Sequence, residues 1–89
     1  MKYSVVKFIH SFRSEINGEY DDFWEAMFSC LKKNTELGIG NDVISHGGGA
    51  YPHYDINVGK KIMFCGTNLL SYNKYIIPYF WGKNEAPLF

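Results

Sequence analysis

The stretch that decides the fold is EYDDFWEAMFSCLKK, residues 19–33. If each residue advances about 100° around a helix axis, the apolar side chains fill one continuous arc and the charged ones fill the rest. Acidic residues occupy the first turns and lysines the last, which complements the helix dipole. The pattern predicts an amphipathic helix that is capped by Asn17 or Gly18 and ends near Asn34 or Gly38. The apolar arc holds Tyr20, Phe23, Trp24, Ala26, Met27, Phe28, Cys30 and Leu31.

Segments on both sides of this helix have the composition of β-strands. Residues 3–12 are rich in β-branched and aromatic residues and carry apolar side chains on both faces, which is typical of a central strand. Over residues 53–58 apolar and polar side chains alternate, and Gly59-Lys60 suits a tight turn into residues 61–65. We therefore expect a strand at 3–12 and a β-hairpin over 53–65.

Two further segments have less regular patterns. Residues 42–45 could form a short strand inside a glycine-rich loop. Residues 67–77 fit either a second hairpin that turns at Asn73-Lys74 or a short helix ended by Pro78. Of these two readings, we favour the hairpin.

The length and charge of the chain limit its class. With 89 residues, 46% of them hydrophobic and 20% charged, the chain should form one small folded domain, residues 1–89. The elements predict a two-layer α+β fold, an antiparallel sheet of three to five strands with the main helix packed on one face. Nine basic and nine acidic side chains give a net charge of zero. This balance argues against binding that depends on neutralising nucleic-acid phosphates.

Aromatic side chains are more numerous than a small core readily holds. The chain has seven Phe, seven Tyr and two Trp. We expect seven of these rings in the core, namely Phe8, Phe12, Tyr20, Phe23, Trp24, Phe28 and Phe64. Seven others, all in the second half of the chain, predict a partner-binding surface, because exposed Tyr and Trp often anchor interfaces. This surface would comprise Tyr51, Tyr54, Tyr72, Tyr75, Tyr79, Phe80 and Trp81, rimmed by Glu19 and Asp22 on the acidic helix face.

Groups that could carry chemistry are few and form no strong motif. His46, His53 and Asp55 are of types that ligate zinc or iron, but no fourth ligand is spaced nearby. We interpret them as solvent-exposed polar residues and predict no metal, cofactor or catalytic residue. Cys30 and Cys65 are too few for a disulfide framework, and we expect both to be reduced thiols of the core.

These observations favour a small non-enzymatic protein-binding module. Its most specific version is an inhibitor that sterically blocks a larger enzyme, of the phage or mobile-element anti-defence type, and self-association through the same surface is compatible with it. The alternative is a domain that binds single-stranded nucleic acid or a small ligand through Tyr51, Tyr54, Lys60 and Lys61. A small metal-dependent enzyme comes third. We see no signal peptide and no apolar run of membrane-spanning length, so we expect a cytoplasmic protein.

Overall fold

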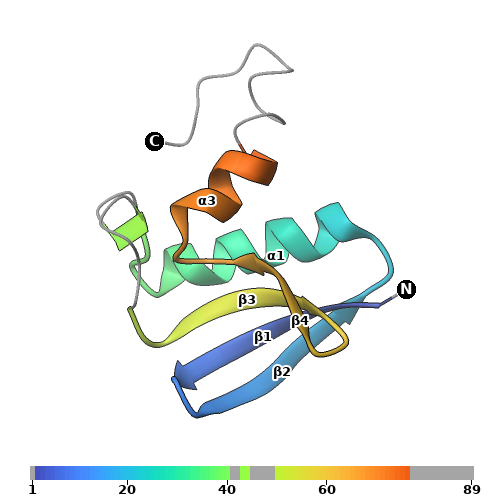
Figure 1. Cartoon of the computed structure of the whole chain (residues 1–89), viewed down its shortest axis with the longest axis horizontal. Coiled ribbons are helices and arrows are strands. Elements are labelled where there is room, and N and C mark those ends of the chain that lie inside the picture. Colours follow the sequence, from blue (N-terminus) through green and yellow to red (C-terminus); the bar gives the residue numbers. More distant parts are fainter. Residues whose placement is uncertain (1, 41–42, 45–49, 77–89) are drawn as a thin grey trace.

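A four-stranded antiparallel sheet with one long helix across it forms the body of the computed structural model, which describes residues 2–40, 43–44 and 50–76. The strand order is β2-β1-β3-β4, and α1 lies on one face of the sheet (Figure 1). The predicted two-layer α+β architecture is confirmed. In chain order the elements are β1 (Tyr3–His10), β2 (Arg13–Tyr20), α1 (Phe23–Glu36), β3 (His53–Val58), β4 (Lys61–Cys65), α3 (Leu69–Ser71) and η1 (Tyr72–Ile76).

Helix α1 begins four residues later than the sequence pattern suggests. Its cap is Asp22, whose side-chain Oδ2 accepts the backbone N–H of Glu25 at 2.9 Å. The predicted cap at Asn17 or Gly18 is therefore wrong. The end is close to the prediction, since Leu37 is the C-cap and Gly38 follows with φ +82°, a conformation that glycine adopts at little cost.

The sequence analysis does not predict strand β2. It places the start of the helix, at residue 19, inside the segment that forms this strand. The segment has few apolar residues and contains Asn17-Gly18, which the sequence analysis interprets as a break before the helix. In the structure these two residues oppose the single residue Val5 between the pairs Ser4–Glu19 and Val6–Ile16. Two residues against one form a β-bulge, which lets the strand continue past the glycine.

The hairpin over residues 53–65 is confirmed, with Gly59-Lys60 as its turn. Gly59 has φ +61°, as the first residue of either primed hairpin turn requires. The pairing is regular at the turn but shifts between Asn57–Ile62 and Ile56–Phe64. Met63 is therefore an extra residue in β4, and every pair beyond it is displaced by one.

The region after β4 is helical. We favoured a hairpin over residues 67–77, and this is wrong up to residue 76, the last one described. Asn68 caps α3 by accepting the N–H of Leu70, and α3 continues directly into the π-helical turn η1. Val43 and Ile44 are also helical rather than part of a strand. Residues 42 and 45 lie outside the described residues.

The core lies between α1, one face of the sheet and η1. Buried side chains there include Val5, Ala26, Met27, Cys30, Ile56, Phe64, Tyr72 and Ile76. Two expectations about the rings are wrong. Phe12 is 95% exposed and Phe28 48% exposed, although both were expected in the core, while Tyr54 and Tyr72 are buried although both were expected at the surface. Tyr72 packs against Phe64 with ring centroids 5.1 Å apart.

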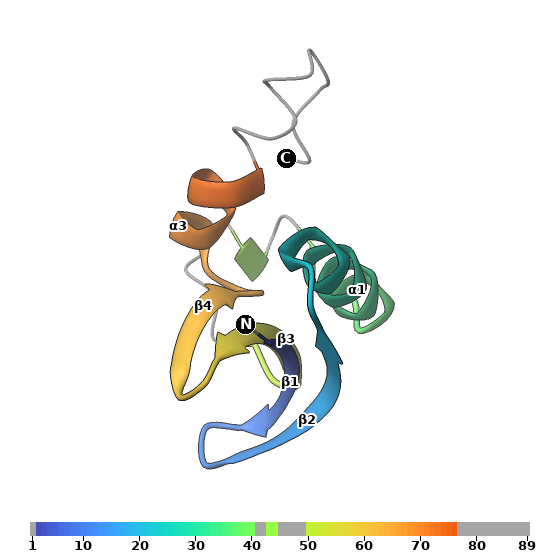
Figure 2. The same cartoon turned by 90° about the vertical axis from the view of Figure 1, so that its right-hand side faces the viewer.

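In the described part of the chain no helix covers the opposite face of the sheet, and we call this the open face. Directly paired residues of antiparallel strands point to the same side. The row Val5–Ile56–Phe64 is buried against α1, so the adjacent row Ile16–Val6–Asp55–Cys65 belongs to the open face. Figure 2 shows that the sheet is strongly curved, with α1 to one side of it. Within the described ranges, none of the helices has the length and apolar character needed to span a membrane.

Candidate metal centre on the open face

Three side chains with metal-binding atoms meet on the open face: His53 and Asp55 from β3, and Cys65 from the end of β4. Their ligand atoms all lie within 4.8 Å of one another. A tetrahedral zinc ion with bonds of about 2.0–2.3 Å needs ligand atoms about 3.3–3.8 Å apart. His53 Nε2 and Asp55 Oδ1 are already 3.2 Å apart, so only small side-chain movements separate this arrangement from a coordination shell.

His53 and Asp55 are buried, with 5% and 2% of their surfaces exposed. The sequence analysis interprets both as solvent-exposed polar residues, and this is wrong. The strand does alternate, but its polar side chains lie on the open face, where neighbouring rings cover His53. The Phe8 ring stacks on the His53 ring at 5.6 Å, and the Tyr51 ring packs on it at 4.9 Å.

The orientation of the His53 ring follows from its backbone partner. Nδ1 lies 2.7 Å from the carbonyl oxygen of Ala50, which can only accept, so Nδ1 carries a proton and donates it. Nε2 is then the nitrogen that faces Asp55. A backbone carbonyl that fixes the remote nitrogen in this way is the usual outer partner of a metal-ligating histidine.

The contact between Nε2 and the Asp55 carboxylate requires a proton or a metal ion between the two atoms, because two lone pairs at 3.2 Å would repel. Burial alone would lower the pKa of His53. Hydrogen bonds to Asp55 and Cys65 and to the carbonyl of Ala50 outweigh burial and raise that pKa to about 10. Without a metal the ring is therefore an imidazolium. A metal ion can take the place of the Nε2 proton.

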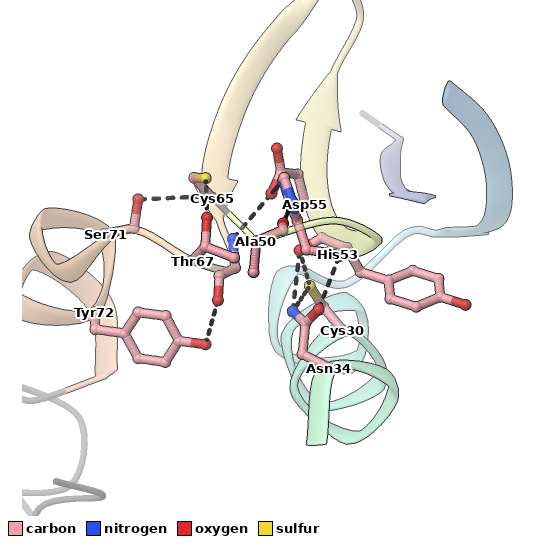
Figure 3. Close-up of polar contacts among 11 residues, drawn as sticks. Cys30, Asn34, Ala50, His53, Asp55, Cys65, Thr67, Ser71 and Tyr72 are labelled. Carbon is pink, nitrogen blue, oxygen red and sulfur yellow. Dashed lines mark hydrogen bonds and ion pairs between the residues drawn. The ribbon is translucent and has the colours of Figure 1, made fainter. Parts of the chain in front are cut away.

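Asp55 and Cys65 are held by neighbours of their own. The backbone N–H of Gly66 donates to Asp55 Oδ1 at 2.9 Å. The backbone N–H of Cys65 donates to Ser71 Oγ at 3.1 Å, and the thiol lies 3.5 Å from the hydroxyl of Thr67. Each of the three potential ligands thus has a second partner that fixes its position (Figure 3). Supported ligands of this kind are typical of functional metal sites.

Helix α1 positions the strand that carries two of the three ligands. Asn34 is buried and pairs with both backbone groups of Tyr54, the residue between His53 and Asp55. Its Nδ2 donates to the Tyr54 carbonyl at 3.0 Å, and its Oδ1 accepts the Tyr54 N–H at 2.8 Å. We call these two hydrogen bonds the Asn34 clamp (Figure 3). The clamp holds the backbone of β3 at Tyr54, and this fixes the side of the sheet to which His53 and Asp55 point.

Gly66 packs against the same clamp. A Cβ atom at this position would collide with the Asn34 side chain and the Tyr54 carbonyl. The carbonyl of Gly66 accepts the hydroxyl of Tyr72 at 2.9 Å, and burial raises the pKa of that hydroxyl above its usual range. Segments around residues 34, 54 and 66 therefore meet at one tightly packed point behind the three ligands.

The two cysteines differ in environment. Cys30 is fully buried on α1, where its thiol donates to the Tyr54 carbonyl at 3.3 Å, and burial raises its pKa. The expectation of a buried core thiol is confirmed for Cys30. Cys65 is half-buried and lines a pocket of about 280 Å³ on the open face, together with His53 and Asp55. Only Cys65 is therefore placed to act as a ligand for a metal that enters from solvent.

Within the described part of the chain, the predicted partner-binding side chains do not form one exposed surface. Tyr54 and Tyr72 are buried, Tyr75 is half-buried against Phe23, and Tyr51 is exposed at the edge of the pocket. Glu19 is exposed, but it lies on β2 rather than on a helix face, and the carboxylate of Asp22 serves as the cap of α1. Tyr79, Phe80 and Trp81, like His46, lie outside the described residues.

Comparison of the chain with known proteins does not indicate a role for this site. The chain matches no protein-family model, no curated protein and no solved structure. Its chemistry must therefore be inferred from the donor atoms, their partners and the pocket around them.

Proposed function

We propose that the protein binds one transition-metal ion, zinc by its donor set, through His53 Nε2, Asp55 Oδ1 and Cys65 Sγ. The observation that supports this most strongly is convergence. All three donor atoms lie within 4.8 Å of one another, while the second nitrogen of the histidine is held by a backbone carbonyl. Calcium and magnesium prefer shells of oxygen, whereas mixed nitrogen, oxygen and sulfur ligands suit zinc.

A Cys-His-Asp nucleophilic triad fits the same residues less well. In a triad the base uses one ring nitrogen for the nucleophile and the other for the carboxylate, which orients the ring. Here the carboxylate of Asp55 faces Nε2, which also interacts with Cys65, and Nδ1 is used by Ala50. Because Asp55 and Cys65 both approach the same ring nitrogen, the arrangement favours a metal ion shared by the three side chains over a proton relay through the ring.

Cobalt(II) binding tests the proposal, because cobalt substitutes for zinc and absorbs visible light. We expect one equivalent of cobalt to give a tetrahedral spectrum with a sulfur-to-cobalt charge-transfer band. Cys65→Ser should lose that band, since serine offers no sulfur ligand. Cys30→Ser is the matched control and should keep it, because the Cys30 thiol only donates to a backbone carbonyl.

Two results would contradict the metal site. One is a wild-type spectrum without the charge-transfer band at saturating cobalt under reducing conditions. The other is a band that persists in Cys65→Ser and disappears in Cys30→Ser, since that would move the sulfur ligand to the buried helix.

Protein binding is a second candidate function, and exposed apolar side chains favour it. Phe12 is 95% exposed, Ile16 65% and Ile62 51%. Ile16 and Ile62 both lie on the open face, and Phe12 is at the turn between β1 and β2. Such side chains are costly to leave in water and typical of contacts between chains. The partner we propose is a second copy of this chain, docked over Phe12 and Ile16 at the β2 edge of the sheet, so that the pocket beside His53 and Cys65 stays accessible.

Light scattering with the variant Phe12→Ser tests self-association. We expect the wild-type mass to correspond to two chains at micromolar concentration and the variant mass to one. Leu70→Ser is the control, because Leu70 is 75% exposed on α3, away from the hairpin turn. A wild-type monomer at all concentrations would contradict self-association.

The more specific expectations from the sequence stay predictions. They are an enzyme inhibitor, a cytoplasmic location and the absence of catalysis.

A further inference from the structure

We infer that the metal has an open fourth position facing the pocket on the open face, and that this position takes a neutral nitrogen heterocycle with an apolar ring attached. This inference rests on the proposed metal site. It names the class of ligand that the site would accept.

The three donors found among the described residues leave a fourth position open. Zinc is most often four-coordinate, and sites with three protein ligands keep the fourth place for water or a bound molecule. Among the described residues, only His53, Asp55 and Cys65 form a group of this kind. The three donors project from β3 and β4, so the sheet lies behind the metal. The remaining position must then point away from the sheet, toward the pocket that these same residues line.

The walls of the pocket suit a flat apolar body. Phe8 and Tyr51 both pack against the His53 ring, and they line the pocket together with Ile62. Ile62 is 51% exposed and Tyr51 is 46% exposed. Rings gain additional stability from offset or edge-to-face contacts with other rings. A ligand that carries an aromatic ring would therefore bury apolar surface on three side chains.

The charge of the site favours a neutral headgroup. A divalent ion bound by a thiolate, a carboxylate and a neutral imidazole has no net charge left to attract an anion. Apart from the proposed ligand His53, none of the described residues that line the pocket is basic, while Ser11, Thr67 and Asn68 offer uncharged polar groups. A carboxylate ligand would therefore be buried without a counter-charge, which is unfavourable. A heterocyclic nitrogen donates a lone pair to the metal and brings no charge.

The experiment is a titration of the cobalt-loaded protein with 4-phenylimidazole, imidazole and benzoate, followed through the visible bands of cobalt. We expect 4-phenylimidazole to bind at least about tenfold more tightly than imidazole, because its phenyl ring leaves water. We expect benzoate, which has the same ring and a charged headgroup, to bind at least about tenfold more weakly than 4-phenylimidazole. The charge-transfer band must persist throughout, which confirms that the metal has not been extracted.

A pair of variants places the ligand in the pocket. Ile62→Ala should weaken the binding of 4-phenylimidazole severalfold and leave the binding of imidazole unchanged, since only the phenyl ring reaches Ile62. Leu70→Ala is the matched control, because Leu70 is exposed and does not line the pocket. Neither residue contributes a metal ligand, so both variants should load cobalt normally.

The outcomes separate the two proposals. If no charge-transfer band forms in the first place, the metal site itself fails. If the band forms but none of the three ligands changes the visible spectrum, the metal site stands and the open position is refuted. Tighter binding of benzoate, or equal binding of imidazole and 4-phenylimidazole, would overturn the neutral and apolar character assigned to the ligand.

Discussion

Zinc at about one hundred times its dissociation constant is expected to stabilise the folded protein by about 2.7 kcal/mol. For a domain of this length that corresponds to a rise in melting temperature of about 10–20 °C. The physical reason is that His53, Asp55 and Cys65 converge only in the folded chain, so the ion binds the folded state far better than the unfolded one. Calorimetric melting with and without zinc, in reducing buffer, measures the shift.

Two controls make the melting shift specific. Cys65→Ser should lose most of it, because Cys65 is half-buried and its replacement removes a ligand without opening the core. Magnesium at the same concentration should produce little change, since it binds oxygen shells. A melting temperature of the wild-type protein that zinc leaves unchanged would be incompatible with the metal site.

Asn34→Leu is expected to destabilise the protein by about 2–5 kcal/mol. The change removes both hydrogen bonds of the Asn34 clamp, which leaves the Tyr54 N–H buried without a partner and the Tyr54 C=O with only the weak Cys30 thiol donor. An orphaned buried polar group costs about 1–3 kcal/mol, and a side chain of similar volume does not compensate for it. Urea unfolding of the metal-free protein measures the loss.

The neighbouring residue provides the comparison for Asn34. Thr35 is exposed, and its hydroxyl donates only to the Leu31 carbonyl of its own helix, so Thr35→Ala should change stability by less than about 0.5 kcal/mol. Asn34→Asp keeps the acceptor for the Tyr54 N–H but turns a buried carboxylate oxygen toward the Tyr54 carbonyl, so it should destabilise the protein at least as much as Asn34→Leu. Equal stability of Asn34→Leu and Thr35→Ala would show that the clamp does not support β3.

Much of the fold could be predicted from local patterns. The segregated arc of residues 19–33 predicted the helix, and the alternation around Gly59-Lys60 predicted the hairpin. Strand β2 could not be predicted in the same way, because its side chains are mostly exposed and its apolar residues show no regular spacing. Its conformation depends on pairing with β1 and on a bulge that accommodates Asn17-Gly18. Pairing of this kind is a tertiary interaction.

The candidate site could be predicted only in part. The sequence analysis named His46, His53 and Asp55 as ligand types but found no fourth ligand spaced nearby. A regular hairpin with a two-residue turn would place Asp55 opposite Phe64 and send Cys65 to the helix side. Met63 shifts the register by one, so that Asp55 pairs with Cys65 and both reach the open face. No local propensity marks a residue as the extra one in a bulge, so this convergence becomes visible only in three dimensions.

The close packing around Gly66 has a consequence for how the chain acquires its site during synthesis. Residues 34, 54 and 66 are far apart in sequence, and their contacts must all form before the ligands are aligned. Contacts of such long range close late in folding, after local helices and hairpins. A growing chain that stops before Gly66 already contains the amino acids that build α1 and β3, yet it lacks the Gly66 N–H that holds Asp55 and the packing of Gly66 against the Asn34 clamp. Metal uptake should therefore follow completion of the fold rather than guide it.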